Sequence, residues 1–324
     1  MLLGVSVITF VLARIIPSNA AAMYIGPKAR PEDIARVTHQ LGLDQPLPVQ
    51  YLTYVRDVLV GDWGTSIATK RPVLDEILGR LPATLELILV AMAIAIPVGI
   101  ALGVLSARWR GRPPDVVVRL VSIVGVSLPA FFLALVLQIL FFRNLHLLPL
   151  AGRVAADLRF THPISSITGL NLIDTLATGN WAAFGDSAYH LILPAIALAA
   201  YPLGLIARMT RSSMLDTLDQ DYIRTARAFG LGIGIIEYRL ALRNAILPVL
   251  TVIGLTFGYL ITGSFFVEIV FNWPGLGTFA VHSLLSVDYP AIMGIALLGA
   301  IGYVVINLVV DLGQAWLDPR VRLT

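Results

Sequence analysis

The stretch Leu205–Gly230 reads LIARMTRSSMLDTLDQDYIRTARAFG and lies between two long apolar segments of the chain. It predicts a short charged helix with a defined start and stop, flanked on both sides by segments that favour lipid. A helix of this kind is expected on the water side of an all-α, polytopic membrane protein, where it has the properties of a docking element.

Residues at both ends of this stretch favour a helix boundary. Asp219 is expected to be the N-cap, and Asp221 adds negative charge to the first turn, where the helix dipole favours it. Gly230 supplies the left-handed residue that ends the helix. The docking helix is therefore predicted between Asp219 and Gly230.

The predicted helix has an apolar face and a cationic face. The apolar positions are Tyr222, Ile223, Ala226 and Phe229, and the cationic positions are Arg224 and Arg227. An apolar groove with an acidic rim on a partner protein would accept such a helix. The surface of an anionic membrane would accept it equally well, and the pattern alone leaves both readings open.

Composition places the whole chain in a bilayer. Its 324 residues are 57% hydrophobic and 13% charged, and its mean hydropathy is +0.83, which leaves too little polar surface for a soluble protein of this size. Apolar runs of about 20 residues are long enough to cross the hydrocarbon core. The predicted spans of this kind are Leu87–Ala107, Leu120–Phe142, Ser187–Ala207, Asn244–Val267 and Tyr289–Val310.

The expected organisation has three parts. Residues 1–16 are apolar but lack the basic start of a signal peptide, so we expect a first span whose first turn is missing. Residues 17–83, which proline and glycine interrupt repeatedly, are expected to form an extracytoplasmic subdomain. Residues 84–324 are expected to form a five-span core with a cytoplasmic loop at 208–243.

Arginine placement predicts the orientation of the spans. The loop Arg108–Arg119 contains four arginines and the loop Arg208–Arg243 contains six, whereas the loop Phe271–Asp288 contains no lysine or arginine. Because basic loops stay in the cytoplasm, the first two loops and both termini are expected there. Arg208 and Arg211 would then anchor the cytoplasmic end of their span, and a hydrogen bond to the docking loop is an additional possibility.

Sequence motifs for catalysis and nucleotide binding are absent. Neither of the two lysines, Lys28 and Lys70, follows a glycine, so the chain has no Walker A loop. The sequence contains no His-Glu-x-x-His motif, no Gly-x-Ser-x-Gly motif and no cysteine. We therefore expect no catalytic residue, metal site, cofactor or nucleic-acid partner for this chain.

Polar and small residues within the spans have two expected roles. Glycine pairs at Gly99 and Gly103 and at Gly254 and Gly258 predict close helix packing within the subunit. Prolines within the spans predict kinks that free carbonyl groups along a path. The polar candidates for lining a translocation path are Ser127, Gln138, Thr256, Tyr259 and Thr262.

The docking stretch and its continuation, EYRLALRNAILPVL, resemble the cytoplasmic loop of permease subunits of ABC importers, in particular those of the peptide and nickel class. That loop carries Glu-Ala-Ala, three residues, a glycine and later an apolar-Leu-Pro ending. Here the glutamate and the first alanine are replaced, and LGIGII precedes Glu237 where the family usually carries charges. The matching residues are Arg224, Thr225, Ala226, Gly230, Ile246, Leu247 and Pro248.

The resemblance covers nearly the whole chain, including LGLDQPLPVQYLTYV, SLPAFFLALVLQILF and VVDLGQAWLDPRVR. It implies the type I ABC importer permease fold with about six spans, and it favours an ATPase as the partner of the docking helix. The coupling residues that it implies are Asp219, Asp221, Tyr222, Arg224, Thr225, Ala226, Arg227, Phe229 and Gly230.

The implied function is import of oligopeptides or dipeptides across the cytoplasmic membrane of a prokaryote. The implied partners are a second homologous permease subunit, two ATP-binding subunits that hold ATP and Mg²⁺, and an extracytoplasmic substrate-binding protein. This chain itself would not be an enzyme. A nickel or metal-chelate importer of the same fold, and a channel or membrane scaffold without an ATPase, are the alternatives.

Overall fold

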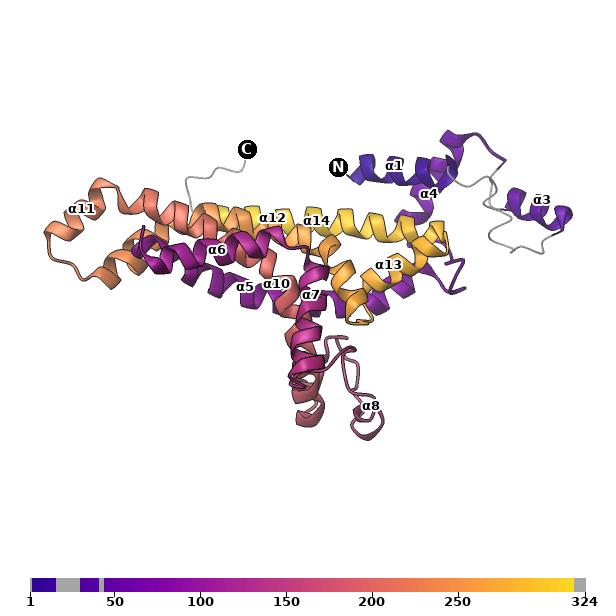
Figure 1. The fold of residues 1–324 in the computed structure, drawn as a ribbon. Helices are drawn as coiled ribbons and strands as arrows, with labels where there is room; N and C mark the ends of the chain where they lie inside the picture. Colours follow the sequence, from indigo (N-terminus) through magenta and orange to yellow (C-terminus); the bar gives the residue numbers. More distant parts are fainter. Residues whose placement is uncertain (1, 16–29, 41–43, 318–324) are drawn as a thin grey trace. The chain divides into compact units, whose positions relative to one another are not determined.

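The computed structural model describes residues 2–15, 30–40 and 44–317. Helices make up most of these residues (Figure 1), and the β structure among them is an isolated bridge between Thr65 and Pro72. The chain divides into two compact units, and each is described separately. The first unit comprises Met1–Leu81 with Thr278–Gly302, and the second comprises Pro82–Gly277 with Tyr303–Thr324.

The first unit joins the N-terminal helices to the loop between two later helices. Asp288 accepts hydrogen bonds from Ser66 Oγ at 2.5 Å and from the Ala68 backbone N–H at 3.1 Å. Phe10 packs edge-on against Tyr51, with ring centroids 5.4 Å apart. The helices concerned are α1 (Leu2–Ile15), α3 (Pro31–Gln40), α4 (Leu47–Leu59), the start of α5 (Val73–Arg108), most of α13 (Leu276–Leu285) and the first part of α14 (Tyr289–Leu317).

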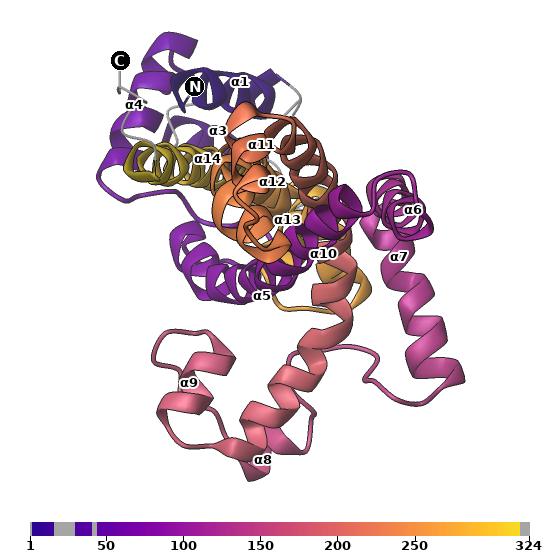
Figure 2. The ribbon, with the colours of Figure 1, turned by 90° about the vertical axis from the view of Figure 1, so that its left-hand side faces the viewer.

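The central helix of the second unit is α10 (Trp181–Leu218). Figure 2 shows α6 and α7 along one side of it. Its neighbours are α6 (Pro113–Ser127), α7 (Ala130–Leu137), α9 (Asn171–Ala177), η2 (Ile235–Ala241) and α12 (Leu242–Val270). Three short elements complete the unit: η1 (Gln138–Asn144), α8 (Leu158–Thr161) and α11 (Asp221–Ala228).

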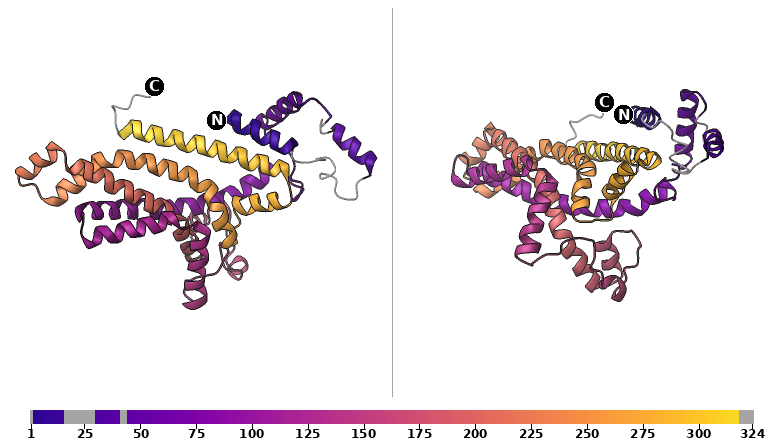
Figure 3. Two further views of the ribbon diagram at one scale, coloured as in Figure 1. Left: turned by 45° about the horizontal axis from the view of Figure 1, so that its top comes forward. Right: turned by 45° about the vertical axis from the view of Figure 1, so that its right-hand side comes forward.

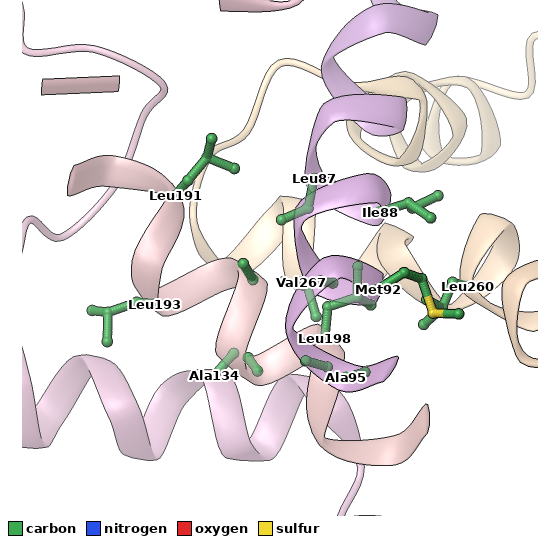
Figure 4. Close-up of a cluster of buried hydrophobic side chains, with 14 of the residues drawn as sticks. Leu87, Ile88, Met92, Ala95, Ala134, Leu191, Leu193, Leu198, Leu260 and Val267 are labelled. Atoms are coloured by element: carbon green, nitrogen blue, oxygen red, sulfur yellow. The ribbon is translucent and has the colours of Figure 1, made fainter. Parts of the chain in front are cut away.

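The apolar core of the second unit is formed by helices that are distant in the sequence. Met92 of α5, Leu198 of α10 and Leu260 of α12 are fully or almost fully buried members of one cluster, which Figure 4 shows. Because lipid tails are as apolar as these side chains, the cluster is stabilised by van der Waals packing between the helices. The long α10 is thereby held between α5 and α12.

Two glycines bring α5 close to α10, as the sequence predicted. A Cβ atom at Gly103 would lie 2.4 Å from Thr210 Cβ and 2.7 Å from the Ala207 carbonyl oxygen. A Cβ atom at Gly99 would lie 2.8 Å from Ile206 Cγ2. The helices therefore approach each other at distances that only glycine permits.

The same packing is found between α12 and α14 within the second unit. A Cβ atom at Gly254 would lie 2.5 Å from Val310 Cγ2, and one at Gly258 would lie 2.8 Å from Tyr303 Cδ2. Both predicted glycine pairs are therefore confirmed as intrasubunit packing positions.

We expect Gly103→Val to lower the midpoint temperature of thermal unfolding of the detergent-purified protein. The new side chain would displace the Ala207 backbone, and overpacking of this kind costs about 1–3 kcal/mol. Gly79→Val is the matched control, because a Cβ atom at Gly79 in the same helix meets nothing within 4 Å. Equal shifts for the two variants would contradict the close packing of α5 on α10.

Four helices in the described part of the chain are long and apolar enough to cross a bilayer, which supports a multi-pass membrane protein. They are Val73–Arg108, Trp181–Leu218, Ile235–Ile261 and Tyr289–Val310. The predicted span Leu120–Phe142 is instead bent by 107° between α6 and α7, and it gives a fifth span if the bent pair counts as one. The helix α1 has 14 residues, fewer than the roughly 20 that a span needs.

The bend in the predicted span has a local cause. Leu128, at φ −81° and ψ 127°, is extended rather than helical. Pro129 follows it, and proline disfavours helical geometry in the residue before it. The predicted span Leu120–Phe142 is therefore broken at Leu128, next to Pro129, one of the prolines within the spans for which a kink was predicted.

In the second unit, loops that were predicted to share a side of the membrane are in contact with each other. At one end, Arg211 Nε donates to Asp115 Oδ1 at 2.7 Å, which joins the loop Arg108–Arg119 to the last turns of α10. At the other end, the Gly152 backbone N–H donates to the Phe271 carbonyl oxygen at 2.8 Å. These contacts agree with the predicted sidedness of the loops.

Candidate functional site

The helix α11 and its flanking residues form the candidate coupling site. Figure 3 shows α11 in the turn that connects α10 to η2 and α12. Its N-cap is Gln220, which is extended at φ −71° and ψ 150° and makes no side-chain cap hydrogen bond. Asp219 is the C-cap residue of α10. The prediction of Asp219 as N-cap of the docking helix was therefore wrong, because α10 continues as far as Leu218.

The other end of α11 agrees with the prediction. Gly230 has φ +74°, which glycine adopts at little cost. Its N–H donates to the Arg227 carbonyl at 2.9 Å, and the Leu231 N–H donates to the Ala226 carbonyl at 3.2 Å. These two bonds form a Schellman motif, which satisfies the last carbonyls of the helix. Asp221 lies in the first turn, also as predicted.

The apolar face of α11 is divided between the protein interior and solvent. Ile223 and Ala226 are 0% and 6% exposed, and they pack in a cluster that includes Val104 of α5 and Met214 of α10. Since their own chain covers them, these two residues fasten α11 to the second unit. The prediction that they would present a docking face to a partner is corrected accordingly.

What remains exposed is the coupling surface, which we define as Tyr222, Arg224, Thr225, Arg227 and Phe229. Phe229 is 81% exposed. Arg224 Nη1 lies 3.1 Å from Asp221 Oδ1 in an exposed ion pair, which contributes little stability. The exposed side chains of α11 and its C-cap therefore include two cations, two aromatic rings and the carboxylate of Asp221.

Hydrogen bonding and exposed apolar residues extend this surface beyond the helix. Tyr222 OH accepts a hydrogen bond from Asn244 Nδ2 at 2.7 Å. The following loop exposes Leu231 and Ile233, which belong to the LGIGII segment. Contiguous exposed apolar side chains outside the spans are typical of a protein interaction surface.

A buried carboxylate joins the α5–α6 turn to α10 at the same end of α10 as the coupling surface. Asp115 is 1% exposed and accepts hydrogen bonds from Ser106 Oγ at 2.6 Å and from the Gly111 N–H at 2.9 Å. Arg211 donates to it from Nε at 2.7 Å and from Nη2 at 3.0 Å. Arg211 thus binds the neighbouring loop, and within the part of the chain that the structure describes it makes no side-chain hydrogen bond to the docking loop.

Sequence reasoning missed Asp115. The available signal was a single acidic residue among the four arginines of the loop Arg108–Arg119. A second ion pair is found at the same end of the second unit. Arg108 Nη1 lies 3.5 Å from Glu237 Oε2, without hydrogen-bond geometry. Together the two pairs connect α5, α6, α10 and η2 near α11.

Two of the predicted path residues line one cavity. Thr256 and Tyr259 of α12 face a cavity of about 470 Å³ between α10 and α12. The rings of Tyr201 and Tyr259 pack with centroids 4.6 Å apart. The remaining lining residues are Leu205, Arg208, Met209, Ser212, Val252 and Leu255.

The other predicted path residues do not join this cavity. Gln138 Nε2 donates to the Leu150 carbonyl at 2.9 Å and to the Val270 carbonyl at 3.0 Å, so its side chain connects two chain segments. Ser127 is exposed at the last position of α6. Thr262 lies in α12, and its side chain is outside the described part of the structure.

Comparisons with known proteins identify a family for nearly the whole chain. A family model described as "Binding-protein-dependent transport system inner membrane component" matches residues 99–323. The N-terminal model of the same transport-system membrane component matches residues 1–88.

Individual relatives are similar over nearly their full length. The chain is 47% identical over 318 residues to the probable D,D-dipeptide transport system permease protein DdpB of Escherichia coli (strain K12), which covers 98% of this chain and 93% of the relative. It is 43% identical over 321 residues to the dipeptide transport system permease protein DppB of Alkalihalophilus pseudofirmus, and the match covers 99% of this chain and 95% of the relative. It is 40% identical over 321 residues to the glutathione transport system permease protein GsiC of Salmonella typhi, and the match covers 99% of this chain and 94% of the relative.

Proposed function

The chain belongs to the family of binding-protein-dependent transport system inner membrane components, and from this membership we propose that it is the permease subunit of an ATP-driven importer of dipeptides or oligopeptides. The substrate class is supported by the relatives named as dipeptide transport permeases, at 42–47% identity. The names of these relatives favour a peptide substrate over nickel, which is the substrate of the alternative importer.

One observation carries the coupling part of this proposal. The helix α11 is fastened to its own chain through Ile223 and Ala226, while the coupling surface stays exposed. A helix held in this way transmits force from a partner to α5 and α10 instead of sliding on the membrane surface. This favours docking to a protein over the alternative of lying on anionic headgroups.

The proposed assembly contains more than this chain. Two ATP-binding subunits would bind ATP and Mg²⁺ and grip the α11 helices of this subunit and of a second homologous permease. Their closure would move the spans, and an extracytoplasmic binding protein would deliver the peptide. The chain would have six spans in the cytoplasmic membrane of a prokaryote, with both termini in the cytoplasm.

Transport by the reconstituted assembly tests this function. We expect proteoliposomes that contain both permeases and both ATPases to accumulate labelled L-alanyl-L-alanine only when ATP and the binding protein are supplied. Liposomes without the ATPase subunits are the control. Dipeptide entry that needs no ATP would indicate a channel, and accumulation of Ni²⁺ in place of dipeptide would indicate a metal importer. Either result would overturn the proposal.

A further inference from the structure

The cavity between α10 and α12 contains one cation among apolar walls. Arg208 lines it together with the packed rings of Tyr201 and Tyr259. Its volume of about 470 Å³ lies within the range of about 300–1,000 Å³ that is usual for small-molecule sites. The apolar walls are formed by Leu205, Met209, Val252 and Leu255.

Arg208 differs from the arginine one helical turn further along α10. Arg211 is neutralised by the buried Asp115. Arg208 makes no hydrogen bond or ion pair to any residue in the described ranges 2–15, 30–40 and 44–317. Arg208 is exposed and lies at the predicted cytoplasmic end of its span, so its guanidinium is free to pair with an anion that enters the cavity.

We infer that Arg208 binds the terminal carboxylate of the peptide in transit, an inference that rests on the proposed function. Every linear peptide carries this group whatever its side chains are. The planar guanidinium can donate two parallel hydrogen bonds to a carboxylate. The apolar walls and the two tyrosine rings would accept different side chains by contact alone.

This arrangement separates two aspects of recognition. The constant charged end of the peptide is bound by one strong polar contact, while the variable side chains meet a mostly apolar surface whose hydroxyl groups are those of Ser212, Thr256 and the two tyrosines. Arg208 lies about three helical turns before Leu218, the last residue of α10, so the site would hold the peptide in the part of the path toward the α11 end of α10.

A photoreactive dipeptide tests the site in the complete reconstituted transporter. L-alanyl-photo-leucine is expected to label residues of α10 and α12 that line the cavity. Arg208→Gln should abolish this labelling and lower dipeptide uptake about 10-fold or more, the usual effect of removing a hydrogen bond to a charged group. Arg208→Lys should retain part of the uptake. Arg110→Gln, which removes an exposed arginine outside the cavity, should leave the photolabelling and the dipeptide uptake at the wild-type level.

A measurement on the unaltered protein covers the case in which Arg208→Gln fails to assemble. In the detergent-solubilised complex of permeases and ATPases, L-alanyl-L-alanine should compete with the labelling at least about 10-fold better than its C-terminal amide. Equal competition by the two compounds would overturn the inference, and so would wild-type uptake by Arg208→Gln.

Two further outcomes have a defined meaning. If Arg208→Gln reduces uptake only in vesicles that contain phosphatidylglycerol, Arg208 binds a lipid headgroup and the inference is wrong. If the wild-type assembly accumulates no dipeptide, the proposed function itself fails and the carboxylate site fails with it. Wild-type uptake that Arg208→Gln leaves unchanged removes the inference but not the proposed function.

Discussion

Reversing the two arginines of α11, with Arg224→Glu and Arg227→Glu together, is expected to prevent co-purification of the ATPase subunits and to reduce ATP-dependent dipeptide uptake about 100-fold. Both side chains are exposed and belong to the coupling surface. If a partner groove has an acidic rim, the new glutamates would face like charges and leave the rim groups without partners. Pull-down of the ATPases and uptake into proteoliposomes measure the two effects.

The matched control for this reversal is Arg110→Glu together with Arg112→Glu. These residues lie in the loop Arg108–Arg119, and the control changes the net charge by the same amount outside the coupling surface. It should keep ATPase binding and uptake close to the wild-type level. Retained association and normal uptake in the α11 variant would count decisively against α11 as the docking element.

The second large effect is expected from Asp115→Ala, which should destabilise the protein by about 3–5 kcal/mol. The substitution removes the acceptor of Arg211, whose side chain is 23% exposed, and leaves a partly buried guanidinium without its anion. The Ser106 hydroxyl and the Gly111 N–H lose their acceptor as well. Thermal unfolding in detergent measures the loss of stability, and ATP-dependent uptake measures its effect on coupling.

A double substitution separates the ion pair from general damage. Asp115→Ala with Arg211→Met removes both charges, so it should be less destabilising than Asp115→Ala alone. Asp216→Ala, which removes an exposed acid near the end of α10, should be close to neutral. If Asp115→Ala lowers the stability no more than Asp216→Ala does, the ion pair between Asp115 and Arg211 does not hold α6 to α10.

The elements that sequence reasoning predicted are those that local chemistry determines. Ser187–Ala207 and Asn244–Val267 lie within long helices because runs of this length and polarity have few alternatives in a membrane. Gly230 ends α11 because a position with φ +74° favours glycine. Gly99 and Gly103 pack against α10 because their missing side chains allow close approach.

The features that were missed depend on distant parts of the chain. Asp115 and Arg211 are 96 residues apart, and no local pattern pairs them. The amphipathic pattern of α11 showed that Ile223 and Ala226 share a face, but a pattern does not say which protein covers that face. The same applies to Gln138, whose amide reaches a carbonyl 132 residues away instead of facing a path.

The most direct test of the central claim, that partner ATPases act on this chain through α11, is a site-directed cross-link. The chain contains no cysteine, so Phe229→Cys provides a unique attachment point for a benzophenone maleimide on the coupling surface. In the assembled transporter, illumination is expected to cross-link position 229 to an ATPase subunit. The account would be contradicted if this probe labelled only lipid while the same probe at Arg110→Cys captured the ATPase.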